Sequence, residues 1–263
     1  MNLAGRDVLL TGATGGIGAA IARALAARGA RVVLTGRRVE QLDALAGEIG
    51  GRAVAADLSE PDAPARLTAE AGEIDVLVAN AGLPASGALT SFSEQEIDRA
   101  IDVNLRAPVV LARLLAGPTI ERRRGHLVFV SSLSGKAAAP NSSLYSATKF
   151  GLRGFALGLR QDLAPHGVGV SCVYPGFVRG AGMFADSGAT LPPGVGTSSP
   201  QEVAAGVVRA IERDRAEVDV APLGLKAGVR LAVVAPTVTA RVQKRLGSFK
   251  LSEAIGAGQR DKR

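Results

Sequence analysis

Short apolar runs recur along the first 220 residues, and most of them are continuous rather than alternating with polar positions. Continuous apolar runs are typical of parallel strands that are covered on both faces of their sheet. We therefore predict seven strands, at residues 7–12, 31–36, 52–57, 75–82, 125–132, 168–176 and 217–222.

Between these runs lie longer segments in which Ala, Leu and Ile recur every three or four positions, with charged residues opposite them. This period predicts helices that bury one face. The segments span residues 16–30, 40–50, 62–72, 94–123, 145–167 and 200–214. Their alternation with the strands predicts an α/β fold, a doubly wound parallel sheet of about seven strands with helices on both faces.

Two segments depart from this alternation. Residues 177–200 are rich in Gly, Pro and Ser and show no clear period. Because they follow the carboxyl end of a predicted strand, where open sheets bind ligands, we interpret them as a substrate lid rather than a disordered segment. Residues 221–263 continue past the last strand, so we predict one domain over 1–220 and a separate C-terminal extension.

The formal net charge of +7 is unevenly distributed. Residues 1–220 hold 22 basic and 22 acidic side chains, whereas residues 221–263 hold nine basic and two acidic ones. The extension therefore carries the whole excess, and the neutral body argues against a nucleic-acid partner.

The content of cysteine and histidine limits other classes of function. One cysteine, Cys172, and two histidines, His126 and His166, exclude a disulfide framework and a Cys/His metal site, so we predict no metal. No apolar run approaches the roughly 20 residues of a spanning helix, and the first residues do not resemble a signal peptide. We expect a soluble, cytoplasmic protein.

A glycine-rich turn links the first predicted strand to the first predicted helix. The stretch "LLTGATGGIGAAIARAL" places Gly12, Gly16 and Gly18 at this junction. Glycines there allow close approach of the backbone, and the helix N-terminus offers unpaired N–H groups to a pyrophosphate. We interpret the stretch as a dinucleotide-binding loop.

The second predicted strand ends without a carboxylate. An NAD-binding site usually has Asp or Glu here for the adenosine ribose, whereas this chain has Arg37 and Arg38. Two guanidinium groups match a 2′-phosphate better, so we predict NADP, with NAD less favoured, and assign Arg37 ahead of Arg38. Asp57, after the third strand, can accept from adenine or cap the next helix.

Six short motifs occur in one order. They are "TGATGGIG" (11–18), "NAG" (80–82), Asn104, "VSSLSG" (130–135), "YSATK" (145–149) and "PG" (175–176). On these motifs the chain resembles the short-chain dehydrogenases/reductases over residues 5–220. The resemblance implies a single Rossmann-type catalytic domain that uses NAD or NADP.

The resemblance also implies the roles of individual residues. Tyr145 would be the general acid/base, Lys149 its activator, Ser132 the hydroxyl that polarises the carbonyl and Asn104 the holder of a water. The cofactor-binding residues would be Gly12, Thr14, Gly16, Ile17, Gly18, Arg37, Arg38, Asp57, Leu58, Asn80, Ala81, Gly82, Tyr145, Lys149, Pro175, Gly176 and Val178. The family often has a threonine two residues after Val178, where this chain has Gly180.

The spacing of Tyr145 and Lys149 has a physical meaning of its own. Residues four apart lie on one face of a helix, so the ammonium can approach the phenol. One charge about 5 Å away at an effective dielectric near 20 contributes roughly 3 kcal/mol, or about two pKa units. With the second positive charge of an oxidised nicotinamide, we expect the pKa of Tyr145 to approach neutral pH.

The leading hypothesis is an NADP-dependent oxidoreductase that interconverts a carbonyl and a secondary alcohol on a small molecule. The predicted lid offers Phe177, Met183, Phe184, Leu191 and Val195, which favours an apolar or acyl substrate. The alternative is a non-catalytic NADP(H)-binding sensor or scaffold that acts through the basic extension. The family resemblance further suggests a homodimer or homotetramer.

The extension permits three interpretations. Lys226, Arg230 and Arg241 alternate with apolar residues, which predicts an amphipathic basic helix interrupted near Pro236. It can dock on the body or on a partner subunit and line the substrate pocket, lie on an anionic membrane surface, or remain a solvated tail.

Overall fold

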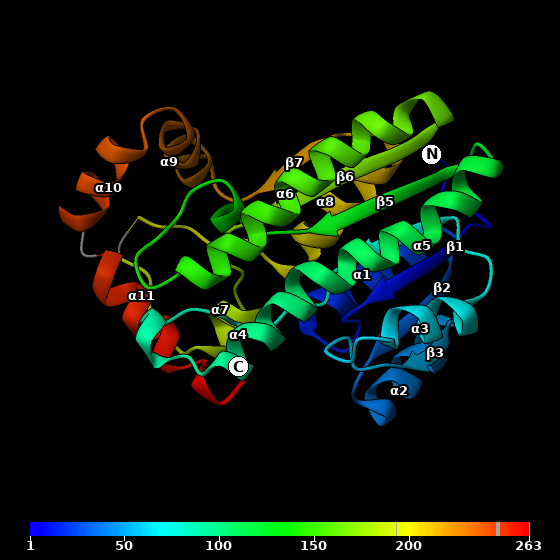
Figure 1. Ribbon diagram of the computed structural model, residues 1–263, viewed down its shortest axis with the longest axis horizontal. Coiled ribbons are helices and arrows are strands. Elements are labelled where there is room, and N and C mark those ends of the chain that lie inside the picture. The colour runs from blue at the N-terminus through cyan, green and yellow to red at the C-terminus, as the bar shows by residue number, and fades with distance from the viewer. Residues whose placement is uncertain (193, 246–247, 263) are drawn as a thin grey trace.

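The computed structural model describes residues 1–192, 194–245 and 248–262. Seven parallel strands form one sheet in the order β3-β2-β1-β4-β5-β6-β7 (Figure 1). The strands are β1 (Asp7–Thr11), β2 (Arg31–Gly36), β3 (Arg52–Ala55), β4 (Val76–Ala79), β5 (Gly125–Val130), β6 (Val168–Pro175) and β7 (Glu217–Val220). Each lies inside a predicted run, so the predicted doubly wound α/β sheet is confirmed. The strand order reverses between β1 and β4, and such a switch point is where open sheets bind ligands.

Helices cover both faces of the sheet, as predicted. On one face lie α1 (Gly16–Ala26), α2 (Val39–Ile49) and α8 (Pro200–Glu212), and on the other lie α3 (Ala63–Ala71), α5 (Ala107–Glu121) and α6 (Ser143–Leu163). Successive strand residues point to opposite faces, so both cores need apolar residues, and this explains the continuous apolar runs.

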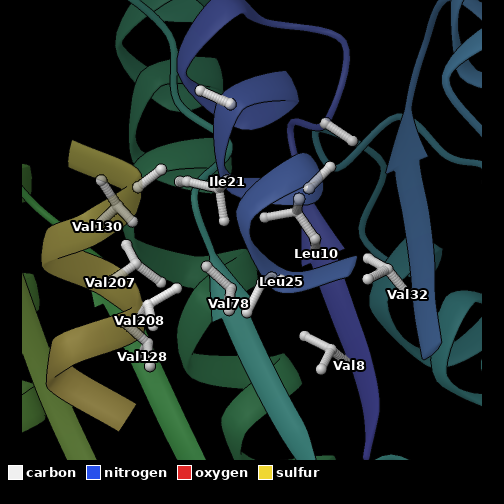
Figure 2. Close-up of a cluster of buried hydrophobic side chains, with 14 of the residues drawn as sticks. Val8, Leu10, Ile21, Leu25, Val32, Val78, Val128, Val130, Val207 and Val208 are labelled. Carbon is white, nitrogen blue, oxygen red and sulfur yellow. The ribbon is translucent and has the colours of Figure 1, made fainter. Parts of the chain in front are cut away.

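The core on the first face shows how successive residues of one strand enter different cores. Val8 and Leu10 of β1 pack beneath Ile21 and Leu25 of α1 (Figure 2). Val207 and Val208 of α8 belong to the same core. Leu9, between them in the sequence, belongs to the core on the other face. All of these side chains are essentially inaccessible to water, and burying each one contributes about 1.5–3 kcal/mol.

Residues 94–121 form one continuous helical run, close to the predicted 94–123, but the run is not α-helical throughout. The structure has α4 (Glu94–Ile101), a π-helical turn (Asp102–Arg106) and then α5. Ser93 and Glu96 form a capping box that fixes the start of α4. Pro108 lies just after the π-helical turn, and this wider turn lets the helical run continue past a residue that has no N–H to donate.

The segment 177–200 is partly regular, contrary to the expectation of a wholly irregular loop. It contains α7 (Gly182–Asp186), and Val178 pairs with Ser198 in an isolated bridge. Pro200 already belongs to α8, whose capping box joins Ser199 and Glu202. The isolated bridge holds the two ends of the segment, Val178 and Ser198, next to each other.

The C-terminal extension forms three helices, α9 (Leu223–Val234), α10 (Pro236–Arg245) and α11 (Ser248–Ala257). The break before Pro236 is where the sequence places it, because proline favours a non-helical residue before it. After α11 the chain contacts the loop 177–200, since Gln259 donates to the Met183 carbonyl at 2.7 Å and Lys262 pairs with Asp186 at 2.7 Å. Among the described residues, none of the helices combines the length and apolarity needed to cross a membrane.

Candidate active site

A cavity of about 1140 Å³ lies at the carboxyl ends of the strands. It is lined by the loops that follow β1 to β6 and by parts of the extension. Of the predicted site residues, all but Asn104 line it: Gly12, Thr14, Gly16, Ile17, Gly18, Arg37, Arg38, Asp57, Leu58, Asn80, Ala81, Gly82, Ser132, Tyr145, Lys149, Pro175, Gly176 and Val178.

The glycine loop has no room for side chains. Gly12 has a φ of +67°, and a Cβ there would lie 2.8 Å from the Ala81 Cα. A Cβ on Gly18 would lie 2.1 Å from the Gly12 carbonyl oxygen. The first helix begins at Gly16 with no side-chain cap on its N–H groups. Such an uncapped helix start beside a bare backbone turn suits a pyrophosphate.

Two polar side chains lock the ends of β1 and β4 together. Asn80 donates from Nδ2 to the carbonyls of Thr11 and Gly12, at 3.1 and 3.2 Å. The Thr11 hydroxyl accepts from the N–H groups of Asn80 and Ala81, both at 3.0 Å. The sequence reasoning missed Thr11, although a hydroxyl that interrupts an apolar strand just before a glycine turn was a usable signal.

The two arginines after β2 have different partners. Arg38 donates to the Thr14 carbonyl at 2.6 Å, and Arg37 lies 3.8 Å from a carboxylate oxygen of Asp57. Partial burial of Asp57 opposes ionisation, but hydrogen bonds from Ser59 outweigh it and hold the pKa of that carboxyl below its ordinary value. Asp57 therefore shapes a turn with one oxygen and faces Arg37 with the other.

Tyr145 and Lys149 lie one turn apart near the start of α6. The Lys149 ammonium is 5.6 Å from the centroid of the Tyr145 ring and donates to the Val130 carbonyl at 3.2 Å. Ser132 caps the 3-10 turn Leu133–Gly135, where its hydroxyl accepts from the Ser134 N–H at 3.1 Å. All three side chains line the cavity.

Tight backbone packing holds the Ser132 turn against α6. The Ser131 hydroxyl donates to the Lys149 carbonyl at 3.1 Å. A Cβ on Gly135 would lie 2.6 Å from that same carbonyl oxygen, so only glycine allows the two elements to come this close. The distance between Ser132 and Tyr145 therefore depends on a glycine outside the cavity.

The electrostatics differ from the expectation based on spacing. Burial raises the pKa of Tyr145 to about 12, and its hydrogen bond with the Ser132 hydroxyl opposes this rise without cancelling it. Burial lowers the pKa of Lys149 to about 8. The expected fall in the pKa of Tyr145 counted the positive charges of Lys149 and of an oxidised nicotinamide but not the loss of water, which disfavours both charged forms.

Asn104 is not among the residues that line the cavity, and its role as the holder of a water stays a prediction. It is fully buried in the π-helical turn. Its amide accepts from the Leu83 N–H at 2.7 Å and donates to the Leu83 carbonyl at 3.0 Å. Both ends of the amide therefore hold the loop after β4, next to Gly82.

The apolar part of the cavity comes from two segments that are far apart in the sequence. The loop 177–200 contributes Phe177, Met183, Phe184 and Val195, while Leu191 is not among the lining residues. The extension contributes Leu225, Val229, Leu251 and Ile255, which the sequence reasoning did not single out. The two residues of each helix are four positions apart, and this helical spacing was the signal in the sequence that they share a buried side.

A family model described as short chain dehydrogenase matches residues 6–191. The ketoacyl reductase HetN of Nostoc sp. is 39% identical over 225 residues, which cover 82% of this chain and 78% of that protein.

Two solved structures support the same grouping. A short-chain dehydrogenase from Sphingobium yanoikuyae in complex with NADPH is 29% identical, has a TM-score of 0.77, and the match covers 92% of this chain and 96% of the other. A metagenomic short-chain oxidoreductase in complex with NADP is 38% identical with a TM-score of 0.68, covering 84% and 99%. The chain thus belongs to the short-chain dehydrogenase/reductase family and is an oxidoreductase that uses a nicotinamide cofactor.

Proposed function

We propose that the protein is an NADP-dependent oxidoreductase that interconverts a carbonyl and a secondary alcohol, with Tyr145 as general acid/base. The observation that carries the proposal is the arrangement of one continuous cavity. The same cavity is lined by Ser132, Tyr145 and Lys149 and by the glycine loop with Arg37 and Arg38.

The residues present fit an NADP cofactor. The uncapped start of α1 and the bare turn at Gly12 would hold the pyrophosphate, and Arg37 with Arg38 would hold the 2′-phosphate. The two residues directly after β2 are Arg37 and Arg38, and neither is the carboxylate that an unphosphorylated ribose favours. When bound, the cofactor would supply or accept the hydride.

Ser132 and Tyr145 would act on the substrate oxygen. The Ser132 hydroxyl oxygen accepts from the Ser134 N–H, so its one proton can be donated to Tyr145 or, when substrate is bound, to the carbonyl oxygen. The pKa of about 12 keeps Tyr145 protonated at neutral pH, as a proton donor for reduction must be. Lys149, with a pKa of about 8, is mostly charged at pH 7 and would stabilise the phenolate that forms.

The substrate we propose is apolar or acyl. Phe177, Met183 and Phe184 on one side and Leu225 and Val229 on the other give the cavity an apolar wall. The relative HetN is named a ketoacyl reductase, and a structure that is 30% identical is named a putative betaketoacyl-ACP reductase. Both names agree with a 3-oxoacyl thioester among the candidates.

The test is the initial rate of oxidation of NADPH and, separately, NADH with a panel of ketones, aldehydes and 3-oxoacyl thioesters. We expect faster turnover with NADPH and a preference for apolar or acyl substrates. Tyr145→Phe should lower kcat by about 10²–10⁴-fold while NADPH still binds. Wild-type turnover by Tyr145→Phe would contradict the proposed mechanism, and NADPH binding without turnover on any substrate would favour the sensor alternative.

A further inference from the structure

The extension exposes apolar side chains that nothing in the described structure covers. Of the ten large apolar residues exposed among the described residues, six lie on α9, α10 and α11. Leu223 and Val234 are the most exposed, at 84% and 83%. The six residues are Leu223, Leu231, Val233, Val234, Val238 and Phe249.

Helix α9 is apolar on two sides. Leu225, Val229 and Ala232 face the body, where the first two line the cavity and the third is buried. Leu223 and Val234 are eleven residues apart, which is close to three helical turns, so they share the outer side. Leu231 is also exposed and lies between this side and the cavity. A helix that packs one side and leaves an apolar stripe on the other is suited to a second apolar surface.

On each of α9, α10 and α11 an exposed basic residue lies within three sequence positions of an exposed apolar one. Arg230 of α9, Arg241 of α10 and Lys250 of α11 are all exposed. We call these three residues, together with the six apolar ones, the extension face. The extension holds nine basic side chains and two acidic ones, and three of the basic ones belong to this face, so the partner that matches it is both apolar and anionic.

The extension face also borders the mouth of the cavity. Leu231 is 53% exposed and at the same time lines the cavity, so the cavity opens beside this face. In Figure 1, α9 and α10 form one end of the molecule, far from α2 and α3 at the other end. A planar surface could therefore meet the extension face without contact with the β3 edge of the sheet.

We propose that the extension face docks on an anionic phospholipid bilayer and sets the mouth of the cavity against it. The apolar side chains would enter the boundary between headgroups and acyl chains, and the basic ones would contact anionic headgroups. A second copy of this chain fits less well, because a two-fold contact through this face would bring two basic surfaces together. The proposal stands independently of the proposed function.

The first test is co-sedimentation of the full-length protein with vesicles of phosphatidylcholine alone or mixed with phosphatidylserine. We expect binding to the mixed vesicles that weakens as salt rises, and little binding to the neutral ones. Leu223→Glu with Val234→Glu should lower binding at least tenfold. Neither residue lines the cavity, so turnover of a water-soluble ketone should be unchanged.

Matched variants separate the apolar contribution to vesicle binding from the electrostatic one. Val39→Glu with Ala44→Glu adds the same charge at exposed apolar sites of α2 and should bind vesicles as the wild type does. Arg230→Gln with Arg241→Gln removes two basic groups and should weaken binding to anionic vesicles about thirty-fold, since each contributes about fivefold near such a surface.

Three results would overturn the proposal. The first is equal binding, or no binding, to neutral and anionic vesicles. The second is an equal loss of binding in the α2 control and in the α9 variant. The third is self-association measured by light scattering that the α9 variant abolishes, with no vesicle binding by the wild type, which would make the face a subunit interface. Vesicle binding by a protein without turnover would leave this inference standing and contradict only the proposed function.

Discussion

Burial favours the neutral form of both Tyr145 and Lys149, because a charged group loses more than a neutral one when water is removed. It raises the pKa of the phenol to about 12 and lowers that of the ammonium to about 8. The pair is therefore ready to donate a proton, and the charge on Lys149 is its variable part. Small changes of pH near 8 should change that charge, while Tyr145 stays protonated.

This difference predicts a pH profile for the proposed reduction. As pH rises through about 8, Lys149 loses its proton and with it the stabilisation of the developing phenolate, so kcat/KM should fall. Lys149→Arg keeps its charge at these pH values, so the profile should flatten even if the overall rate is lower. Initial rates between pH 6 and 10 test this. An unaltered fall in the arginine variant would assign the titration to another group.

A second buried group, His126, lies far from the cavity and links stability to pH. It is 2% exposed, and its Nε2 lies 2.8 Å from the Ser171 hydroxyl. Burial lowers its pKa from 6.5 to about 4. Between these values the unfolded chain binds a proton that the folded protein does not, so stability is full above pH 6.5 and is lost as pH falls toward 4.

At pH 4.5 this linkage should cost about 2.5 kcal/mol of the free energy of unfolding relative to pH 7. His126→Gln retains a group that can hydrogen-bond Ser171 and does not titrate, so its loss of stability over the same range should be smaller by about that amount. Urea denaturation at both pH values measures it. His166→Gln, at the less buried histidine, is the control and should behave as the wild type does.

At the scale of elements, the site depends on contacts that allow no side chain. The Ser132 turn reaches α6 only because Gly135 lies against the Lys149 backbone. Gly135→Ala would place a Cβ 2.6 Å from a backbone oxygen, which cannot move alone, so the turn must shift away from α6. We expect kcat to fall at least tenfold and the free energy of unfolding to fall by about 1–3 kcal/mol, as for overpacking.

The matched control is Gly47→Ala in α2. Gly47 is exposed, and a Cβ there would meet nothing within 4 Å. Alanine is favoured over glycine inside a helix by about 0.5–1 kcal/mol, so this variant should be slightly more stable and equally active. Rates and thermal unfolding of both variants test the pair. Wild-type kcat in Gly135→Ala would show that the distance between Ser132 and Tyr145 does not depend on this contact.

The elements also show how far sequence reasoning reaches. The strands were predictable because each buries both faces and so forms an unbroken apolar run. The π-helical turn at Asp102–Arg106 was not, because it lies within a continuous helical run and its Asn104 side chain contacts the backbone of the distant Leu83. The return of the chain after α11 was also hidden, since it depends on the close approach of Gly258 to Ser187. Local patterns do not encode such long-range contacts.

At the scale of the whole molecule, the proposed cofactor would join the two halves of the sheet. Arg37 and Asp57 follow β2 and β3, whereas Lys149 and Pro175 belong to the half formed by β5 and β6. A ligand that contacts both halves of the folded protein, and not the unfolded chain, stabilises it by an amount set by its concentration and Kd. Thermal unfolding therefore reports cofactor choice independently of turnover.

NADPH at 100 times its Kd should stabilise the protein by about 2.7 kcal/mol, which raises Tm by about 5–10 °C for a chain of this size. NADH at the same concentration should raise Tm less, because no phosphate meets Arg37 and Arg38. Replacing both arginines by glutamine should reduce the NADPH shift toward the NADH shift and leave the NADH shift nearly unchanged. If NADH stabilises the wild type as much as NADPH does, the arginines are ordinary solvated residues and the proposed preference for NADP is wrong, while the rest of the site keeps its proposed role.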